Sequence, residues 1–401
     1  MTRGRFAPSP TGRMHLGNVF CALLSWLSAK SKGGEWVLRI EDLDPQRSRR
    51  EYALQLMDDL QWLGLPWDDE PVWQSQRGHI YEKYLLRLQK MGLTYPCYCT
   101  RADIMATQAP HETDGRVVYK GTCRPKYTDA ACSVSTATSL TTQTVPLRQG
   151  DERSGGGGLT ANHSPFTATP SPLNITPATT RLIVPDFTIP FTDSHYGRHD
   201  INLAEHCGDY IIRRKDGAWA YQLAVVVDDA LTGVTEIVRG RDLLLSSPQQ
   251  IHLRNLLFQS TDGRVQMTEF RVQSTDDLLK RETDSLTPQT VPLGQGHVQS
   301  GGGGLAINPS TFNDQLSTIN FFHHPLLCNA EGQRLCKRDK SLDLGYIRDK
   351  GTTPQEIIGL LAHLASLADT PAPITPQELI PLFSWNKVPT EDILLDHRIT
   401  L

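Results

Sequence analysis

The chain has 401 residues, a formal net charge of −4 at pH 7, 21% charged residues and 38% hydrophobic residues. This length can hold two or three domains with a buried core. No apolar run approaches the roughly 20 residues that cross a bilayer, and no apolar signal region follows Met1, so we expect a cytoplasmic chain without a membrane segment. The net charge excludes a uniformly basic coat for nucleic acid but is compatible with a local basic groove.

The first residues predict a strand, a turn and a helix that bind a nucleotide. Residues 5–7 are expected to form a short buried strand, and the prolines and glycine of residues 8–12 favour a turn. Apolar residues then recur at helical spacing: Leu16, Val19, Phe20, Leu23, Leu24 and Leu27. His15 and Gly17 therefore lie at a helix N-terminus, where free N–H groups and the helix dipole favour phosphate and glycine permits close approach.

Alternating strand and helix signals predict a parallel α/β sheet. Residues 36–40 form a second apolar strand, and amphipathic helices are expected around residues 47–63 and 80–91. Ligands of such sheets bind at the carboxyl ends of the strands. Arg5 and Glu41 fall at the ends of the first two strands, so we expect both at a ligand site.

A repeat marks two segments of low complexity. Residues 139–159 reappear with small changes as residues 285–305, and both copies end in SGGGGL. A solenoid needs at least about three adjacent repeats, so two distant copies do not form one. The Ser, Thr, Pro and Gly bias is typical of flexible insertions. We predict that residues 130–179 and 259–319 loop out of a globular core; the alternative is that they bind a partner.

Cys97 and Cys99 form a CxC pair, followed by a YxGxC sequence from Tyr119 to Cys123. Because no signal region is seen, the eight cysteines indicate reduced thiols or metal ligands rather than disulfides. Structural zinc takes four ligands, often thiolates, and a CxC pair lets two sulfurs reach one ion. Buried free cysteines are the alternative for a CxC pair.

Several motifs together resemble one family. The strings GRFAPSPTGRMHLGN at residues 4–18 and LRIEDLD at residues 38–44 closely resemble the opening of class I glutamyl-tRNA synthetases and their shortened relatives, the glutamyl-queuosine tRNA(Asp) synthetases. HLGN is similar to the HIGH motif, with Asn18 in the last position. RLCKR at residues 334–338 resembles the KMSKS loop in its KLSKR form, with Lys337 at the second lysine.

The resemblance implies an α/β fold: a Rossmann-like class I synthetase catalytic core with a zinc-bearing acceptor-type insertion, a short helical C-terminal region and the two low-complexity insertions. The expected parts are the first half of the catalytic domain at 1–95, the zinc-binding insertion at 96–129, low-complexity insertions at 130–179 and 259–319, the second half of the core at 180–258, and the KMSKS-like loop with the helical region at 320–401. The few residues after Lys337 leave no room for the anticodon-binding region of full-length glutamyl-tRNA synthetases.

The resemblance also implies the residues that bind an acidic amino acid. Arg5 and Arg239 would fix L-glutamate, Ser9 and Tyr221 would add hydroxyl contacts, and Glu41 would face the amino group. These residue types suit the substrate, because arginine recognises carboxylates with planar, charged hydrogen bonds and a carboxylate attracts an ammonium.

The remaining site residues follow from the same resemblance. The catalytic residues would be His15, Gly17, Asn18 and Lys337, and His15, Gly17 and Lys337 would bind ATP. A structural zinc ion would have four ligands: Cys97, Cys99, Tyr119 and Cys123.

The implied reaction activates L-glutamate with ATP, accompanied by Mg²⁺, to glutamyl-adenylate. Glutamate then passes to queuosine in the anticodon loop of tRNA(Asp), and the enzyme is expected to be a monomer. Two alternatives stay open. One is a truncated glutamyl-tRNA synthetase that charges tRNA(Glu), and the other is a catalytically silent tRNA-binding paralogue.

Overall fold

The computed structural model describes residues 1–106, 118–125, 178–258, 319–335 and 343–395. Apart from Pro125, these residues belong to one unit by their contacts. Lys337 and nearly all of the two predicted insertions lie outside the described residues. None of the described helices has the length and apolar character that crossing a membrane requires.

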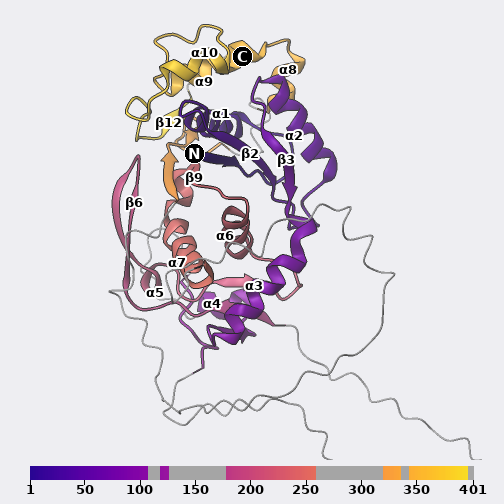
Figure 1. Cartoon of the computed structure of the whole chain (residues 1–401), viewed down its shortest axis with the longest axis vertical. Coiled ribbons are helices and arrows are strands. Elements are labelled where there is room, and N and C mark those ends of the chain that lie inside the picture. Colours follow the sequence, from indigo (N-terminus) through magenta and orange to yellow (C-terminus); the bar gives the residue numbers. More distant parts are fainter. Residues whose placement is uncertain (107–117, 126–177, 259–318, 336–342, 396–401) are drawn as a thin grey trace, which may run out of the picture. The chain divides into compact units, whose positions relative to one another are not determined.

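The main sheet has seven strands (Figure 1). In spatial order they are β3 (Asp68–Trp73), β2 (Glu35–Ile40), β1 (Arg3–Phe6), β9 (Glu236–Gly240), β10 (Asn320–His324), β6 (Thr188–Asp193) and β7 (Gly197–Asn202). Neighbouring strands run parallel except β6 and β7, which form an antiparallel pair. The predicted parallel α/β fold is therefore confirmed.

Along the chain, strands are placed first on one side of β1 and later on its other side, beginning with β9. From β1 the chain passes through α1 (Leu16–Lys30) to β2 and through α2 (Arg50–Trp62) to β3, toward one edge of the sheet. It later passes through α6 (Tyr221–Leu231) to β9, on the other side of β1. The 3₁₀ helix η2 (Arg241–Ser246) and α7 (Ser247–Phe258) follow β9. Ligands of open α/β sheets bind at such a switch point.

Helix α1 fixes the loop after β1 because it is anchored deep in the core. Leu16, Phe20, Leu23 and Leu27 are fully buried, and the helix packs against β1, β2 and β9. Strand β2 is buried along almost its whole length, as expected for a parallel strand covered on both faces. The charged side chain of Arg39 lies inside this buried strand.

A smaller sheet of three antiparallel strands carries the first cysteine of the CxC pair. Its strands are β4 (Thr94–Cys97), β5 (Thr179–Leu182) and β8 (Ile211–Arg213). The helices nearby in sequence are η1 (Gln74–Arg77), α3 (Gly78–Lys90), α4 (Arg101–Ala106) and α5 (Leu203–His206). The predicted helices around residues 47–63 and 80–91 are confirmed as α2 and α3.

The C-terminal region is helical, as predicted. It contains β11 (Leu327–Cys328), α8 (Leu344–Asp349), α9 (Pro354–Leu364), α10 (Pro376–Leu379), η8 (Ile380–Leu382) and β12 (Ile393–Leu394), and β11 pairs with β12. Helices α9 and α10 both begin with a threonine and glutamate that satisfy each other's backbone N–H groups, followed by proline at the first position. Ile357, Ile358, Leu361 and Leu379 of these helices belong to the same core cluster as the buried residues of α1.

Candidate active site and metal site

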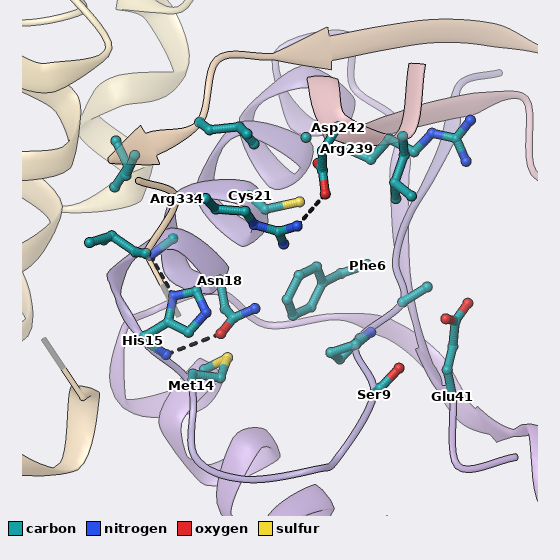
Figure 2. A pocket seen from close by; sticks show the side chains of 18 of the residues that line it. Phe6, Ser9, Met14, His15, Asn18, Cys21, Glu41, Arg239, Asp242 and Arg334 are labelled. Atoms are coloured by element: carbon teal, nitrogen blue, oxygen red, sulfur yellow. Dashed lines mark hydrogen bonds and ion pairs between the residues drawn. The ribbon is translucent and has the colours of Figure 1, made fainter. Parts of the chain in front are cut away.

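A cavity of about 450 Å³ lies at the switch point between β1 and β9. The loop after β1, the start of α1, the end of β9 and the start of α6 contribute to its wall (Figure 2). Of the predicted site residues, these line it: Arg5, Ser9, His15, Gly17, Asn18, Glu41, Tyr221 and Arg239. The structure therefore brings together the predicted amino-acid and nucleotide residues, except Lys337, which lies outside the described part of the chain.

The cavity has two chemically different sides. Figure 2 shows His15 and Asn18, from the start of α1, on one side and Glu41 and Arg239 on the other, with Phe6 between them. A helix N-terminus favours phosphate. A carboxylate and a guanidinium suit the ammonium and carboxylate groups of an amino acid. The arrangement offers separate regions to two ligands.

His15 and Asn18 cap helix α1. The His15 ring accepts a hydrogen bond at Nδ1 from the Gly17 N–H, and Asn18 Oδ1 accepts one from the His15 N–H, both at 3.1 Å. A Cβ atom at position 17 would lie 3.0 Å from the His15 ring. A side chain at position 17 would therefore crowd the ring in this position, and Asn18 in place of the usual final histidine has a structural function at the helix end.

Arg5 lies in a buried charge network under the cavity. Its Nη1 donates to the Val238 carbonyl at 3.3 Å, and its Nε lies 3.6 Å from Asp229 Oδ1. The same Asp229 oxygen accepts from Arg39 at 2.5 Å, and Arg39 also contacts Glu41 at 3.3 Å. The two predicted residues Arg5 and Glu41 are thus linked through Arg39 and Asp229.

The pKa values of the two carboxyl groups in this network shift in opposite directions, although burial disfavours ionisation of both. It raises the pKa of Glu41, and Arg39 and Arg5 offset only part of this effect. Burial also opposes ionisation of Asp229, but Arg39 and Arg5 together hold the pKa of its carboxyl below the ordinary value. The Asp229 carboxylate is therefore ionised at neutral pH and balances positive charge of Arg39 and Arg5.

Arg239 is only 3% exposed and makes four hydrogen bonds. Nε donates to His323 Nε2 at 3.0 Å, and Nη2 donates to Ser247 Oγ at 2.8 Å. Nη1 donates to Gln250 Oε1 at 2.8 Å and to the Tyr221 hydroxyl at 3.4 Å. Burial lowers the pKa of Arg239, although a guanidinium stays charged at neutral pH. These four acceptors are neutral, so the charge of Arg239 is felt by the Asp229 carboxylate without a direct hydrogen bond between them, and its guanidinium can receive an anionic ligand.

The segment that resembles the KMSKS loop enters and leaves next to this cavity. Arg334 lines the cavity and forms an ion pair with Asp242 (Figure 2). Beyond residues 336–342, which are outside the described part, the Leu344 N–H donates to the Met14 carbonyl at 2.9 Å. Met14 lines the cavity as well.

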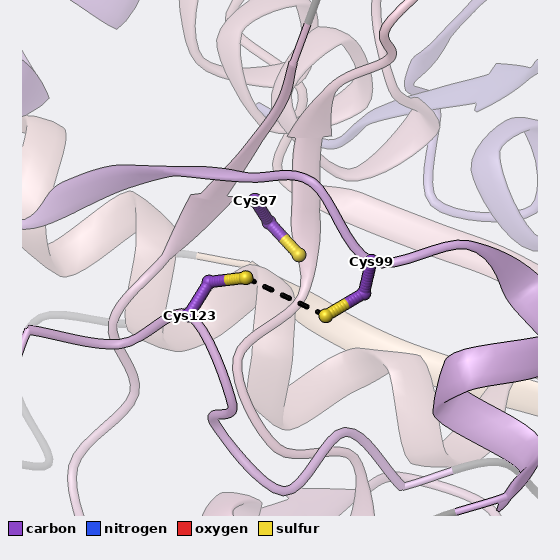
Figure 3. A group of neighbouring side chains, drawn as sticks. All are labelled: Cys97, Cys99 and Cys123. Atoms are coloured by element: carbon purple, nitrogen blue, oxygen red, sulfur yellow. Dashed lines mark hydrogen bonds between the residues drawn. The ribbon is translucent and has the colours of Figure 1, made fainter.

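Cys97, Cys99 and Cys123 form a compact cluster (Figure 3), and their sulfur atoms lie within 4.8 Å of one another. The Tyr119 hydroxyl lies 3.4 Å from Cys97 Sγ and 3.9 Å from Cys99 Sγ. Tetrahedral zinc with Zn–S bonds of about 2.3 Å holds sulfurs about 3.8 Å apart, so the spacing and the donor types fit zinc. Burial opposes ionisation of Cys123, but hydrogen bonds from the Tyr98 backbone and from Cys99 lower the pKa of its thiol to about 7.

Sequence reasoning missed the residues that hold the predicted ones in place. Asp229 and Arg39 support Arg5 and Glu41, and His323 accepts from Arg239. The sequence contains a signal for these two residues. Arg39 interrupts an apolar strand, and Asp229 closes the segment AVVVDD, which begins with four apolar residues. Charged residues inside such runs need buried partners.

Comparisons with known proteins identify the class. Residues 1–139 and 174–294 match the family described as tRNA synthetases class I (E and Q), catalytic domain. The fold is similar to that of a glutamate tRNA ligase from Elizabethkingia meningosepticum, whose crystal structure contains its amino acid. That likeness has a TM-score of 0.64 and 23% identity and covers 98% of this chain and 67% of the other. The chain thus carries the catalytic domain of a class I aminoacyl-tRNA synthetase.

Related sequences narrow this class. A glutamyl-Q tRNA(Asp) synthetase of Symbiobacterium thermophilum is 37% identical over 98% of this chain and 95% of its own length. One from Nitratidesulfovibrio vulgaris is 33% identical over the same shares, and one from Neisseria meningitidis is 42% identical over 64% of this chain and 72% of the relative. The chain therefore belongs to the glutamyl-Q tRNA(Asp) synthetases, a family of ligases.

Proposed function

We propose that this chain activates L-glutamate with ATP to glutamyl-adenylate and transfers the glutamyl group, with release of AMP, to a hydroxyl of queuosine in the anticodon loop of tRNA(Asp), in the cytoplasm. The observation that carries the choice of an acidic substrate is the buried guanidinium of Arg239, which lines the cavity and whose four hydrogen-bond acceptors are neutral. A buried cation is costly unless an anion compensates it. A substrate carboxylate supplies that anion.

The wider charge balance supports glutamate over glutamine. Arg5, Arg39 and Arg239 carry three positive charges, and Glu41 and Asp229, when ionised, carry two negative ones. This group therefore has an excess positive charge, which the single net negative charge of L-glutamate neutralises. Glutamine has no net charge and would leave the excess in place.

In the proposed first step, the α-carboxylate of glutamate attacks the α-phosphorus of ATP and pyrophosphate leaves. His15 and Gly17 hold the triphosphate at the start of α1, where the helix dipole stabilises negative charge. Lys337 stabilises charge on the leaving pyrophosphate. Arg334 and Leu335, three and two positions before Lys337 in the chain, line the cavity and support this role. Mg²⁺ would enter with ATP and would neutralise charge that develops on the phosphates.

The proposed acceptor rests on the relatives, whose names specify glutamyl-Q tRNA(Asp). We further propose that Cys97, Cys99, Tyr119 and Cys123 hold a structural zinc ion. The close approach of their ligand atoms supports this assignment.

The test uses the full chain with labelled glutamate, ATP and three separately prepared RNAs. These are queuosine-containing tRNA(Asp), queuosine-free tRNA(Asp) and tRNA(Glu). We expect label only on the first, retained in the anticodon-loop fragment after nuclease digestion. Label on the 3′ end of tRNA(Glu) alone would instead establish a truncated glutamyl-tRNA synthetase.

A second assay, glutamate-dependent exchange of pyrophosphate into ATP without tRNA, isolates the activation step. We expect exchange with glutamate and none with glutamine. A chain that binds tRNA but supports neither exchange nor transfer would be a silent paralogue.

A further inference from the structure

A chain of buried side chains runs from β6 through β10 to Arg239 on β9. His323 Nδ1 lies 2.7 Å from Asp193 Oδ2, and Arg239 Nε lies 3.0 Å from His323 Nε2. Asp193 is 1% exposed and His323 is fully buried. Neither residue lines the cavity, whereas Arg239 does. His323 Nε2 also lies 3.4 Å from Ser247 Oγ, which itself accepts a hydrogen bond from Arg239.

The chemistry of Arg239 fixes the tautomer of His323. A guanidinium N–H can only donate, so Nε2 of His323 must be the unprotonated, accepting nitrogen. The ring proton therefore sits on Nδ1 and is donated to Asp193. Asp193 is itself held, because its Oδ1 accepts the backbone N–H groups of His195 and Tyr196 at 3.0 and 2.8 Å. Burial lowers the pKa of His323 to about 4, which keeps the ring neutral at pH 7.

We propose that Asp193 and His323 are positioning residues that orient Arg239 while leaving its positive charge for a substrate carboxylate. A carboxylate in direct contact with Arg239 would orient it equally well but would neutralise it and compete with the substrate. The imidazole instead separates Asp193 from the guanidinium and presents a neutral acceptor. The inference rests on the proposed function for the substrate class, an acidic amino acid.

Three substitutions of His323 test separately whether Arg239 needs an acceptor that orients it and whether that acceptor must be neutral. His323→Gln can keep a neutral acceptor, His323→Leu removes the acceptor, and His323→Glu supplies a charged one. In pyrophosphate exchange we expect the KM for glutamate to rise by less than about 3-fold for Gln and by about 10- to 100-fold for Leu, the usual range for losing a hydrogen bond to a charged group. We expect the largest rise for Glu.

The KM for ATP should stay within about 3-fold in all three variants, because the phosphate side of the cavity is unchanged. Equal KM values for glutamate in Gln and Leu, or a Glu variant that binds glutamate like the wild type, would overturn the proposal. The matched control is His252→Gln. His252 is also buried, but it lies on α7 and does not line the cavity, so its replacement should leave both KM values unchanged.

Asp193→Asn tests whether Asp193 acts on Arg239 by controlling the tautomer of His323. The asparagine amide can donate to Nδ1, which favours the other tautomer and turns an N–H of His323 toward the N–H of Arg239. We expect a rise in the glutamate KM similar to that of His323→Leu. In the His323→Gln background, Asp193→Asn should raise the KM for glutamate by less than about 2-fold more, because glutamine has no tautomer for Asp193 to control. If the two substitutions instead raise the KM for glutamate by independent factors that multiply in the double variant, Asp193 has only a structural role.

Nitrogen NMR of labelled histidine gives a readout that needs no activity. We expect the Nδ1–H tautomer of His323 in the wild type and the Nε2–H tautomer in Asp193→Asn. An Nε2–H tautomer in the wild type would refute the proposed orientation of Arg239 by His323 and Asp193, even if the enzyme activates glutamate. Failure of the wild type to support exchange with glutamate would refute the proposed function instead.

Discussion

Single side chains at this site depend on partners that are distant in the sequence. Arg5 is 4% exposed and shares Asp229 with Arg39. Arg39 and Asp229 are separated by 190 positions in the chain, and their hydrogen bond is 2.5 Å long. The sequence indicated Arg5 and Glu41 because they lie near the carboxyl ends of the first two predicted strands. It gave no pairing for Arg39, since a single sequence does not specify which buried groups meet.

Glu41→Gln tests the residue proposed to face the substrate amino group. Without the carboxylate the ammonium loses its counter-charge, so we expect the KM for glutamate in pyrophosphate exchange to rise about 10- to 100-fold, as for loss of a charged hydrogen bond. The KM for ATP should change little.

The matched control is Asp42→Asn, one position further along. Asp42 accepts hydrogen bonds from Ser75 and does not line the cavity, so its replacement should leave the glutamate KM unchanged. An unaltered glutamate KM in Glu41→Gln would remove Glu41 from the proposed site.

At the scale of elements, the start of α1 combines a helix cap with a ligand site. His15 and Asn18 satisfy backbone N–H groups at this terminus. The helix motif was predictable from local spacing, since His15, Gly17 and Asn18 act within one turn. The capping function of Asn18 required the structure, because the same residue type also fits a direct ligand contact.

Asn18→Ala should lower the free energy of unfolding by about 1 kcal/mol, the usual effect of losing a helix cap. Urea unfolding measures this change. Asn18→Asp keeps the accepting oxygen and should retain stability, but its negative charge should raise the KM for ATP. Equal stability of the Ala variant and the wild type would show that the cap contributes nothing.

The cysteine cluster joins the end of β4 to a loop that precedes β5 in the chain, and a metal ion there would tie these segments together. We expect about one zinc ion per purified wild-type chain, the stoichiometry of a single tetrahedral site. Cys123→Ser should lose this zinc and melt at a lower temperature. Cys207→Ser is the control, because Cys207 lies outside the cluster and donates to the Leu203 carbonyl. Zinc retained at wild-type levels by Cys123→Ser would argue against the site.

At the scale of the whole molecule, three of the buried histidines in the described part of the chain link stability to pH. Burial lowers the pKa of His252, His323 and His324 to about 4. Their unfolded pKa is about 6.5, so on acidification the unfolded chain takes up protons before the folded one. The stability that they contribute is complete above about pH 6.5 and is lost toward pH 4.

We expect the free energy of unfolding to fall by up to about 4 kcal/mol per pH unit within this window, the slope for three protons. Urea unfolding at several pH values measures the slope. His252→Gln should make it shallower. A flat profile between pH 7 and 5 would contradict the neutral burial of these rings.

The sequence by itself determined the α/β class, the helical C-terminal region, the nucleotide-type turn before α1 and the grouping of three cysteines. These features depend on spacing within a few residues or on recognisable motifs. The tertiary structure alone decided that β9 lies beside β1, with Gly4 paired to Glu236, and that Arg239 therefore meets Arg5 and Glu41 around one cavity. It also decided the buried partners of these groups, because pairing across a parallel sheet joins residues whose separation in the chain leaves no local pattern.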